Sequence, residues 1–319
     1  MKSVQLPKAP YPVVVRALLS LCLLVWAAAA QATPLRVIVI SDLNGSYGST
    51  SYSDRVSAAI DWIIAERPDL VISTGDMVAG QRKPHLTQLE IRAMWAAFHA
   101  TVSDPLKAAG IPLAVTPGNH DASAYPGFEN ERRIYSEEWR SRRPSVTFID
   151  DTNYPFFYAF EIDGVQFASL DATTLGPLSG DQNDRLRYIF REKGATITFS
   201  HLPLFPFAIG REREIIGDLA LEALYQEHGV DLHLSGHHHA FWPGWKDGIA
   251  YVSQACLGGG PRSLIGTKGK SPHALTLITI DETGSISIEA RVAPDYRRSL
   301  DIQTLPDRIG DLIRIDKRR

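Results

Sequence analysis

Five short apolar runs in this chain each end in side chains that can bind a metal ion or move a proton. The runs are residues 35–40, 69–73, 112–115, 195–199 and 230–234. Continuous apolar segments of this kind are typical of strands that are covered on both faces of a sheet. In open α/β sheets, ligands bind in the crevice beyond the carboxyl ends of the strands. The five runs therefore predict one sheet edge that carries chemistry.

Segments with helical periodicity lie between these strands, at residues 53–66, 86–109, 179–193 and 215–227. This alternation predicts parallel β–α–β units. An Asp163-Gly164 turn between residues 156–162 and 165–170 predicts a β-hairpin. Three further strands are expected at residues 249–253, 274–280 and 285–292. We therefore expect an α/β fold of parallel and antiparallel strands, formed by one domain over residues 33–293.

Two segments lack a clear period. Residues 122–151 are polar and arginine-rich, and form either an insertion that caps the site or a solvated helical excursion. Residues 294–319 are a polar C-terminal tail, which we expect to pack on the surface or to be partly disordered.

The N-terminus has the pattern of a secretory signal peptide over residues 1–32. Lys2, Lys8 and Arg16 precede an apolar run at residues 17–30, and Ala30-Gln31-Ala32 fits a cleavage site. A spanning helix needs about 20 apolar residues, so an uncleaved anchor is the weaker alternative. We expect an exported protein, periplasmic or secreted, with no stable membrane anchor after cleavage.

Charge and cysteine content narrow the possible functions. The formal net charge is −3, whereas nucleic-acid binders usually show a basic excess, so no nucleic-acid partner is indicated. Cys22 and Cys256 are the two cysteines of the sequence, too few for a disulfide framework. After cleavage Cys256 would have no intramolecular partner, and we interpret it as a small buried hydrophobe.

The polar residues at the five strand ends form one candidate set. They are Asp42, Asn44, Asp76, Asn119, His120, Asp121, His201, His237 and His239. Oxygen and nitrogen ligands mixed in this way suit Mn, Fe, Zn or Co better than Ca or Mg. The set is too large for one tetrahedral site, and it fits two metal ions about 3.5–4 Å apart.

In their order, these motifs resemble those of the calcineurin-like metallophosphoesterases. The matching motifs are Asp42-x-Asn44, Gly75-Asp76, Gly118-Asn119-His120-Asp121, His201 and Gly236-His237-x-His239. The resemblance covers residues 35–292. It implies a four-layer fold, in which two mixed β-sheets form a sandwich with helices on both outer faces. It also implies that residues 33–293 are a catalytic domain.

The resemblance implies a role for each residue of the set. Asp76 would bridge two divalent or trivalent metal ions, with Mn, Fe or Zn the expected elements. One ion would also bind Asn119, His201 and His237, and the other Asp42 and His239. His120 would protonate the leaving oxygen while Asp121 orients its ring. A metal-bound hydroxide would attack phosphorus.

Asn44 is the departure from the family, because most members have histidine at this position. The purple acid phosphatase branch lacks that ligand and instead uses a tyrosine three residues after the Gly-Asp aspartate. Here that position is Ala79. We therefore predict that the first metal site is weaker than the family norm.

The resemblance implies a metal-dependent hydrolase of phosphomonoesters or phosphodiesters, with small phosphoesters as substrates and nucleotides among the candidates. The alternative is a catalytically weakened binding or scaffold protein, as in the retromer subunit built on the same fold. Asn44 favours that alternative, and the intact His120-Asp121 pair opposes it.

Other nearby residues are given weaker interpretations. His238 should point away from its two neighbours if the segment is extended. Trp242 and Trp245 either rim the pocket or pack elsewhere, and Gly258-Gly259-Gly260 forms either a substrate loop or a plain turn.

Overall fold

The computed structural model describes residues 33–190 and 194–318. By internal contacts the chain divides into Met1–Pro34 and Leu35–Arg319, and the second unit contains both β-sheets. The predicted signal peptide, with Cys22, lies outside the described residues. Within the described part of the chain, no helix is long and apolar enough to span a bilayer.

The first sheet contains the first three of the predicted strands. Its order is β13 (Arg298–Ser299), β12 (Ile286–Val292), β11 (Ala274–Ile280), β1 (Leu35–Ile40), β2 (Leu70–Ser73) and β3 (Leu113–Val115). Strands β1, β2 and β3 are parallel, and β11 and β12 add antiparallel strands beside β1. The carboxyl ends of β1, β2 and β3 therefore meet at one edge.

The second sheet contains the last two of the five apolar runs, as β7 (Thr196–Ser200) and β8 (Leu232–Ser235). Its order is β14 (Arg308–Ile309), β15 (Leu312–Arg314), β9 (Trp242–Lys246), β10 (Ile249–Ser253), β8, β7, β6 (Val165–Ser169), β5 (Phe157–Ile162) and β4 (Thr147–Asn153). Strands β6, β7, β8 and β10 are parallel, and the hairpin predicted at Asp163-Gly164 joins β5 to β6.

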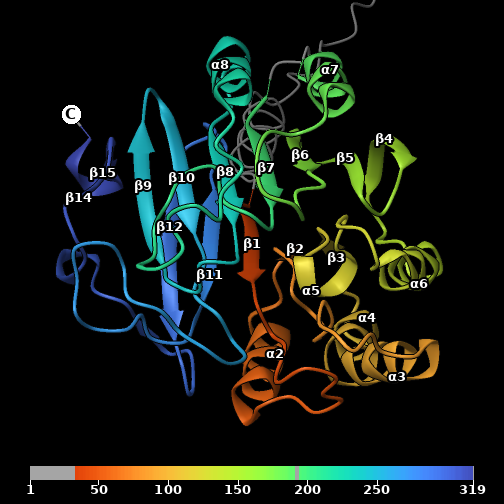
Figure 1. The fold of residues 1–319 in the computed structure, drawn as a ribbon. Helices are drawn as coiled ribbons and strands as arrows, with labels where there is room; N and C mark the ends of the chain where they lie inside the picture. The colour runs from red at the N-terminus through yellow and green to blue at the C-terminus, as the bar shows by residue number, and fades with distance from the viewer. Residues whose placement is uncertain (1–32, 191–193, 319) are drawn as a thin grey trace, which may run out of the picture. The chain divides into compact units, whose positions relative to one another are not determined.

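Helices cover the outer faces of the two sheets. They are α2 (Asp54–Glu66), α3 (Gln88–Phe98), the π-helical turn η1 (His99–Ser103), α4 (Asp104–Ala108), α7 (Gly180–Ile189) and α8 (Leu219–His228). Figure 1 shows α2, α3 and α4 at one side of the sheets and α7 and α8 at the other. The predicted α/β sandwich of two mixed sheets with helices on both outer faces is confirmed.

The alternation of side chains along β5 explains the two hydrophobic cores. Tyr158 and Phe160 belong to the main core, whereas Phe157 and Ala159 belong to the second. A second cluster lies between the outer face of the second sheet and the helices α7 and α8, and includes Leu186 and Leu224. Because strand side chains alternate between faces, one buried sheet supplies both layers.

Residues 122–151 form neither a cap nor a solvated excursion. They include the end of α5 (Asn119–Ala122), all of α6 (Glu129–Arg140) and part of β4. Ile134, Tyr135 and Trp139 of α6 are buried, and Trp139 meets Trp95 of α3 edge to face at 6.0 Å. The buried face of α6 sits among arginines and glutamates, which hid its period in the sequence.

Residues 294–319 were expected to be a surface tail, but the described part of this segment extends both sheets. Strand β13 joins the first sheet, and β14 and β15 join the second. Ile309 and Leu312 pack in the second core, and the buried Arg314 donates to Asp316 at 2.6 Å. Two-residue and three-residue strands leave too short a pattern to recognise.

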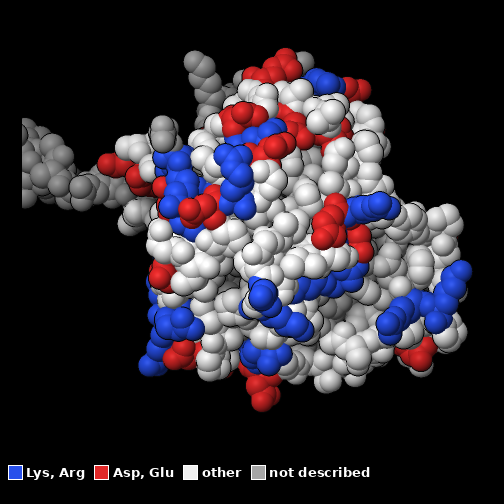
Figure 2. Space-filling model, turned by 60° about the vertical axis from the view of Figure 1, so that its left-hand side comes forward, with Lys and Arg blue, Asp and Glu red and all other residues white. Residues whose placement is uncertain are grey.

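Charged side chains of both signs are interspersed over the face drawn in Figure 2. This agrees with the small net charge of −3.

Candidate metal centre

A polar pocket of about 510 Å³ lies where the strands of the two sheets end. Six of the predicted site residues line it: Asn44, Asp76, Asn119, His120, His237 and His239. Asp42 and His201 are fully buried. The strand ends predicted from the sequence therefore do converge at one place.

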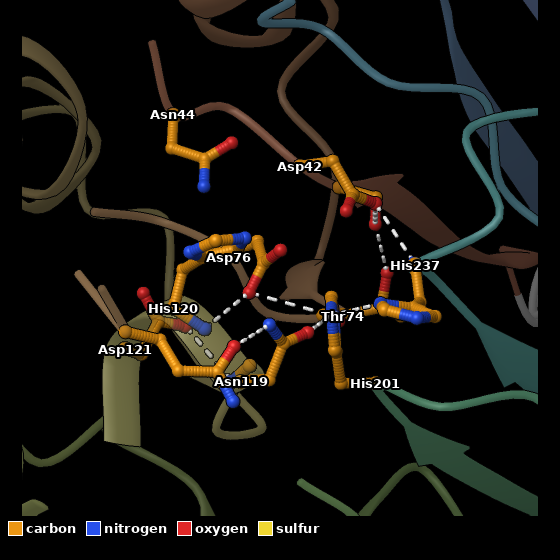
Figure 3. Close-up of polar contacts among 12 residues, drawn as sticks. Asp42, Asn44, Thr74, Asp76, Asn119, His120, Asp121, His201 and His237 are labelled. Carbon is orange, nitrogen blue, oxygen red and sulfur yellow. Dashed lines mark hydrogen bonds and ion pairs between the residues drawn. The ribbon is translucent and has the colours of Figure 1, made fainter. Parts of the chain in front are cut away.

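Two groups of side chains have their ligand atoms within 4.8 Å of one another. Asp76, His201 and His237 form the first group, and Asp42, Asp76 and His239 form the second. Asp76 belongs to both. Asn119 extends the first group, because its Oδ1 lies 2.9 Å from His201 Nε2. Figure 3 shows Asp76, Asn119, His201 and His237 directed toward a common centre.

Each of the three histidines uses its outer ring nitrogen for a hydrogen bond to the protein. His201 Nδ1 pairs with the Thr74 carbonyl at 2.8 Å, and His239 Nδ1 pairs with the Gly260 carbonyl at 2.9 Å. His237 Nε2 pairs with a carboxylate, Glu214 Oε2, at 2.7 Å. Hydrogen bonds of this kind fix the tautomer of metal-binding histidines.

The inner ring nitrogens then face other electron-pair donors. His239 Nε2 lies 2.8 Å from Asp42 Oδ1, an oxygen with no hydrogen-bond donor among the described residues. His201 Nε2 lies 3.3 Å from Asp76 Oδ1 and 3.2 Å from His237 Nδ1. A cation must lie between such atoms, either a proton or a metal ion. The donor set therefore fits two metal ions that share Asp76.

The pKa values of His239, His201 and Asp76 reflect the opposite charges that the site brings together. Burial by itself would lower the pKa of His239, but the adjacent Asp42 carboxylate raises it to about 10. In the same way burial would lower the pKa of His201, but the Asp76 carboxylate outweighs burial and raises that pKa to about 9. Burial would raise the pKa of Asp76, but the neighbouring histidines, His201 first, hold it well below its usual range.

Asn44 lies apart from the other ligand candidates. Its amide nitrogen donates to the Val78 carbonyl at 3.2 Å, and Figure 3 draws no interaction between it and the other residues. The predicted weakness of the first metal site stays a prediction.

The predicted pairing of Asp121 with the His120 ring is wrong. His120 Nδ1 pairs with the Gly80 carbonyl at 2.6 Å, whereas Asp121 accepts the backbone N–H groups of Met77, Val78 and Gly118. Adjacent residues of a helical turn do not face each other, and both residues lie in α5. Asp121 therefore holds the loop that carries Asp76, and burial raises its pKa to about 7.

Four charged residues of the pocket were missed in the sequence, one of which, Arg82, lies in the loop after Asp76. Arg211 and Glu214 come from the segment between β7 and α8, and Arg262 follows Gly260. Arg262 donates to the His237 carbonyl at 3.0 Å. The His237 hydrogen bond is the main cause that lowers the pKa of Glu214 to about 2. A run of alternating arginine and glutamate reads as a solvated surface, so no signal marked these residues.

The remaining sequence features have clear places. Trp242 is buried and donates to the Pro306 carbonyl, and neither it nor Trp245 lines the pocket. Gly259 and Gly260 do line it. His238 points away from the pocket, although its neighbours are not extended: His237 and His239 have φ values of 63° and 51°. Cys256 is buried, as expected.

Comparison with known sequences gives one family. The sequence model of the calcineurin-like phosphoesterases matches residues 35–241. A search of curated proteins found no match.

Solved structures with the same fold include two phosphatases. The purple acid phosphatase PPD1 of yellow lupin has a TM-score of 0.63 at 17% identity, covering 82% of this chain and 52% of that one. The chain thus spans about half of the lupin protein. A dimetal phosphatase of Danio rerio has a TM-score of 0.58 at 16% identity, covering 84% of this chain and 98% of the other.

A third structure carries a different description. GAP50, the anchor in the inner membrane complex of Plasmodium, has a TM-score of 0.54 at 16% identity, and the match covers 82% of this chain and 85% of GAP50. At such identities the likeness concerns the fold.

Proposed function

The chain belongs to the calcineurin-like phosphoesterase family and is a metal-dependent phosphoester hydrolase, and we propose that its substrates are small phosphoesters bound in the pocket beside Asp76. The observation that carries this proposal is the convergence of three histidines on buried carboxylates. His201 and His239 each have a ring nitrogen at a carboxylate, and the ligand atom of His237 lies within 4.8 Å of that of Asp76. Such an arrangement suits two metal ions. The pocket of about 510 Å³ is of the size that holds a small molecule.

Metal ions bound here would supply charge neutralisation and an activated water for attack on phosphorus. The chain's own residues hold and orient the reacting groups. Asp76 is held by the His120 backbone N–H at 2.9 Å, so the shared carboxylate and the acid candidate are fixed to each other. Because His120 Nδ1 is engaged by Gly80, Nε2 is the atom that can give a proton to the leaving oxygen.

The cationic side chains of the pocket favour an anionic substrate. Arg82, Arg211 and Arg262 all line it. Arg211 is paired with Glu214, whereas the contact found for the Arg262 guanidinium is a backbone carbonyl. We propose that Arg262 is the group that receives a substrate anion. Nucleotides are one kind of anionic phosphoester that would fit. The assay below determines whether phosphomonoesters or phosphodiesters are preferred.

The test is hydrolysis of an aryl phosphomonoester and an aryl phosphodiester by residues 33–319. The protein is first treated with a chelator, then supplied with Mn²⁺, and His237→Ala serves as the control. We expect turnover that requires the metal and is lost in the control. A folded protein that binds metal but turns over neither ester would contradict the proposal and favour the scaffold alternative.

Export is the second part of the proposal, and it rests on the pattern of residues 1–32. Expression of the full chain with a C-terminal tag, followed by fractionation and N-terminal sequencing, tests it. We expect a product that starts at Thr33 outside the cytoplasm. A product that retains residues 1–32 in the membrane fraction would favour the uncleaved anchor.

A further inference from the structure

Glu214 is the acidic residue of the pocket that lies outside every motif of the family. It sits in the segment between β7 and α8, at the rim of the pocket. Its Oε2 lies 2.7 Å from His237 Nε2. The other ring nitrogen of His237, Nδ1, lies 3.2 Å from His201 Nε2 and so faces the candidate metal position.

The partner of His237 differs in kind from those of the other two histidines. His201 and His239 donate to backbone carbonyls, whose place is fixed by the fold. His237 donates to a side chain that carries a negative charge. A charged acceptor makes the hydrogen bond shorter and stronger than a neutral one, and increases the electron density on the metal-facing nitrogen.

Two arginines hold the partners of this contact, Arg211 the Glu214 carboxylate and Arg262 the backbone of His237. Arg211, three residues before Glu214, pairs with both oxygens of the carboxylate. Arg262 approaches from another loop and donates to the carbonyl of His237 itself. The carboxylate is therefore restrained, which lowers the entropy that the contact with His237 must overcome.

His238 holds the backbone of the same segment. Its Nδ1 accepts the Phe207 backbone N–H at 3.1 Å, and its Nε2 donates to the Glu214 carbonyl at 3.1 Å. The ring is fully buried. The middle histidine of the His237-His238-His239 run thus anchors the segment that brings Glu214 to the first histidine.

We propose that Glu214 is a positioning residue for the metal site formed by Asp76, Asn119, His201 and His237. Its carboxylate keeps the proton of His237 on Nε2, so that the Nδ1 electron pair stays directed at the metal. This inference rests on the proposed function in that it assumes metal binding at Asp76.

The first test measures metal binding and not activity. Metal-free wild type, Glu214→Ala and Glu214→Gln are titrated with Mn²⁺ or Zn²⁺ by calorimetry, and bound metal is counted after dialysis. Loss of such an outer partner typically weakens metal binding by about 10–100-fold. We expect that loss for one of two ions in Glu214→Ala, and a recovery of most of it in Glu214→Gln, which keeps an acceptor oxygen.

The matched control is Glu212→Ala. Glu212 lies two residues away on the same segment, and its pKa is lowered by backbone N–H groups while its carboxylate is solvent-exposed. We expect its metal binding to equal that of the wild type. Equal affinity of Glu214→Ala and wild type for both ions would overturn the proposal, as would an equal weakening of both ions.

The second test observes the tautomer directly in the metal-free protein. Nitrogen-15 chemical shifts of the His237 ring should show the proton on Nε2 in wild type and in Glu214→Gln. In Glu214→Ala a mixture of tautomers is expected. A single Nε2–H tautomer in Glu214→Ala would overturn the role proposed for the carboxylate. Because neither readout uses a substrate, a wild type that binds two ions without hydrolysis would refute only the proposed function.

Discussion

Replacement of Gly118 by alanine should disable the metal centre through a single methyl group. Gly118 precedes Asn119 in the turn after β3, with φ −88° and ψ 165°. This is ordinary extended backbone that alanine adopts without strain. Any effect of the substitution must therefore come from contacts of the added Cβ.

Those contacts are severe, and they fall on the residue shared by both metal groups. A Cβ at position 118 would lie 2.1 Å from the Asp76 backbone nitrogen and 2.3 Å from Asp76 Oδ1. Real Cβ contacts essentially never fall below 3.0 Å, so the two loops must separate by about 0.9 Å, and a misplacement near 1 Å can cost about 10²-fold in rate. Overpacking of this kind typically costs about 1–3 kcal/mol of stability.

The loops cannot separate without breaking hydrogen bonds. The Asp76 carbonyl accepts the backbone N–H of Leu43 at 2.9 Å and that of Asn44 at 3.2 Å. Asp76 Oδ1 accepts the His120 N–H. A shift of Asp76 therefore disturbs the candidate ligands of three loops together.

The assay compares Gly118→Ala with wild type in three measurements: kcat/KM for an aryl phosphate with added Mn²⁺, bound metal per chain, and urea unfolding of the metal-free protein. Gly180→Ala is the control, since a Cβ there meets nothing within 4 Å. We expect Gly118→Ala to lose about 100-fold in kcat/KM and to bind less metal. Full metal content together with wild-type kcat/KM would refute the reasoning.

Three further predictions concern Asn44, His238 and His233. Asn44→His should tighten the weaker of two metal sites in a calorimetric titration, and two equally tight sites in wild type would contradict the premise. His238→Ala leaves the Phe207 N–H and the Glu214 carbonyl without partners, so urea unfolding should show a loss of about 1–3 kcal/mol; unchanged stability would contradict the anchoring role. Burial lowers the pKa of His233 to about 3, so the unfolded chain binds this proton below about pH 6.5 and the folded protein does not. The contribution of His233 to the free energy of unfolding should therefore be complete above that pH and fall by about 1.4 kcal/mol per pH unit down to pH 3. In the metal-free protein, His233→Asn should reduce the pH dependence of the free energy of unfolding by that amount.

The strands and the ligand positions could be predicted because their signals are local. A strand such as β1, covered on both faces, has a continuous apolar sequence. Polar residues that follow it directly, such as Asp42, must lie at the sheet edge. The same reasoning located Asp76, His201 and His237, with no need for long-range information.

The parts that could not be predicted depend on contacts between distant residues. Glu214 and His237 are 23 residues apart, and nothing in a run of alternating charges indicates which carboxylate turns inward. Strand β9 contains Pro243 and Gly244, residues that ordinarily argue against a strand, and it forms because β10 pairs with it. The role of Asp121 beside the His120 ring came from the family resemblance, whereas the turn of α5 sends the two side chains to different partners.

The backbone at four candidate metal ligands adopts a conformation that is unfavourable in free energy, and local sequence preferences do not reveal it. Asp42, Asp76, His237 and His239 all have positive φ, between 51° and 63°. Such conformations of residues other than glycine cost of the order of 1–3 kcal/mol each and persist where the surroundings over-determine them.

Hydrogen bonds between the loops hold these residues in their positive-φ conformations. The Asp42 N–H donates to the Gly75 carbonyl at 3.1 Å, and the Gly236 N–H donates to the His201 carbonyl at 3.0 Å. Asp42 Oδ2 accepts the His237 N–H at 3.1 Å. The loops are thus tied to one another by the chain itself, and their ligand atoms already converge. The free energy needed to order the loops is therefore part of folding and not of metal binding. The free energy of coordination is then not reduced by a cost of ordering the ligand loops.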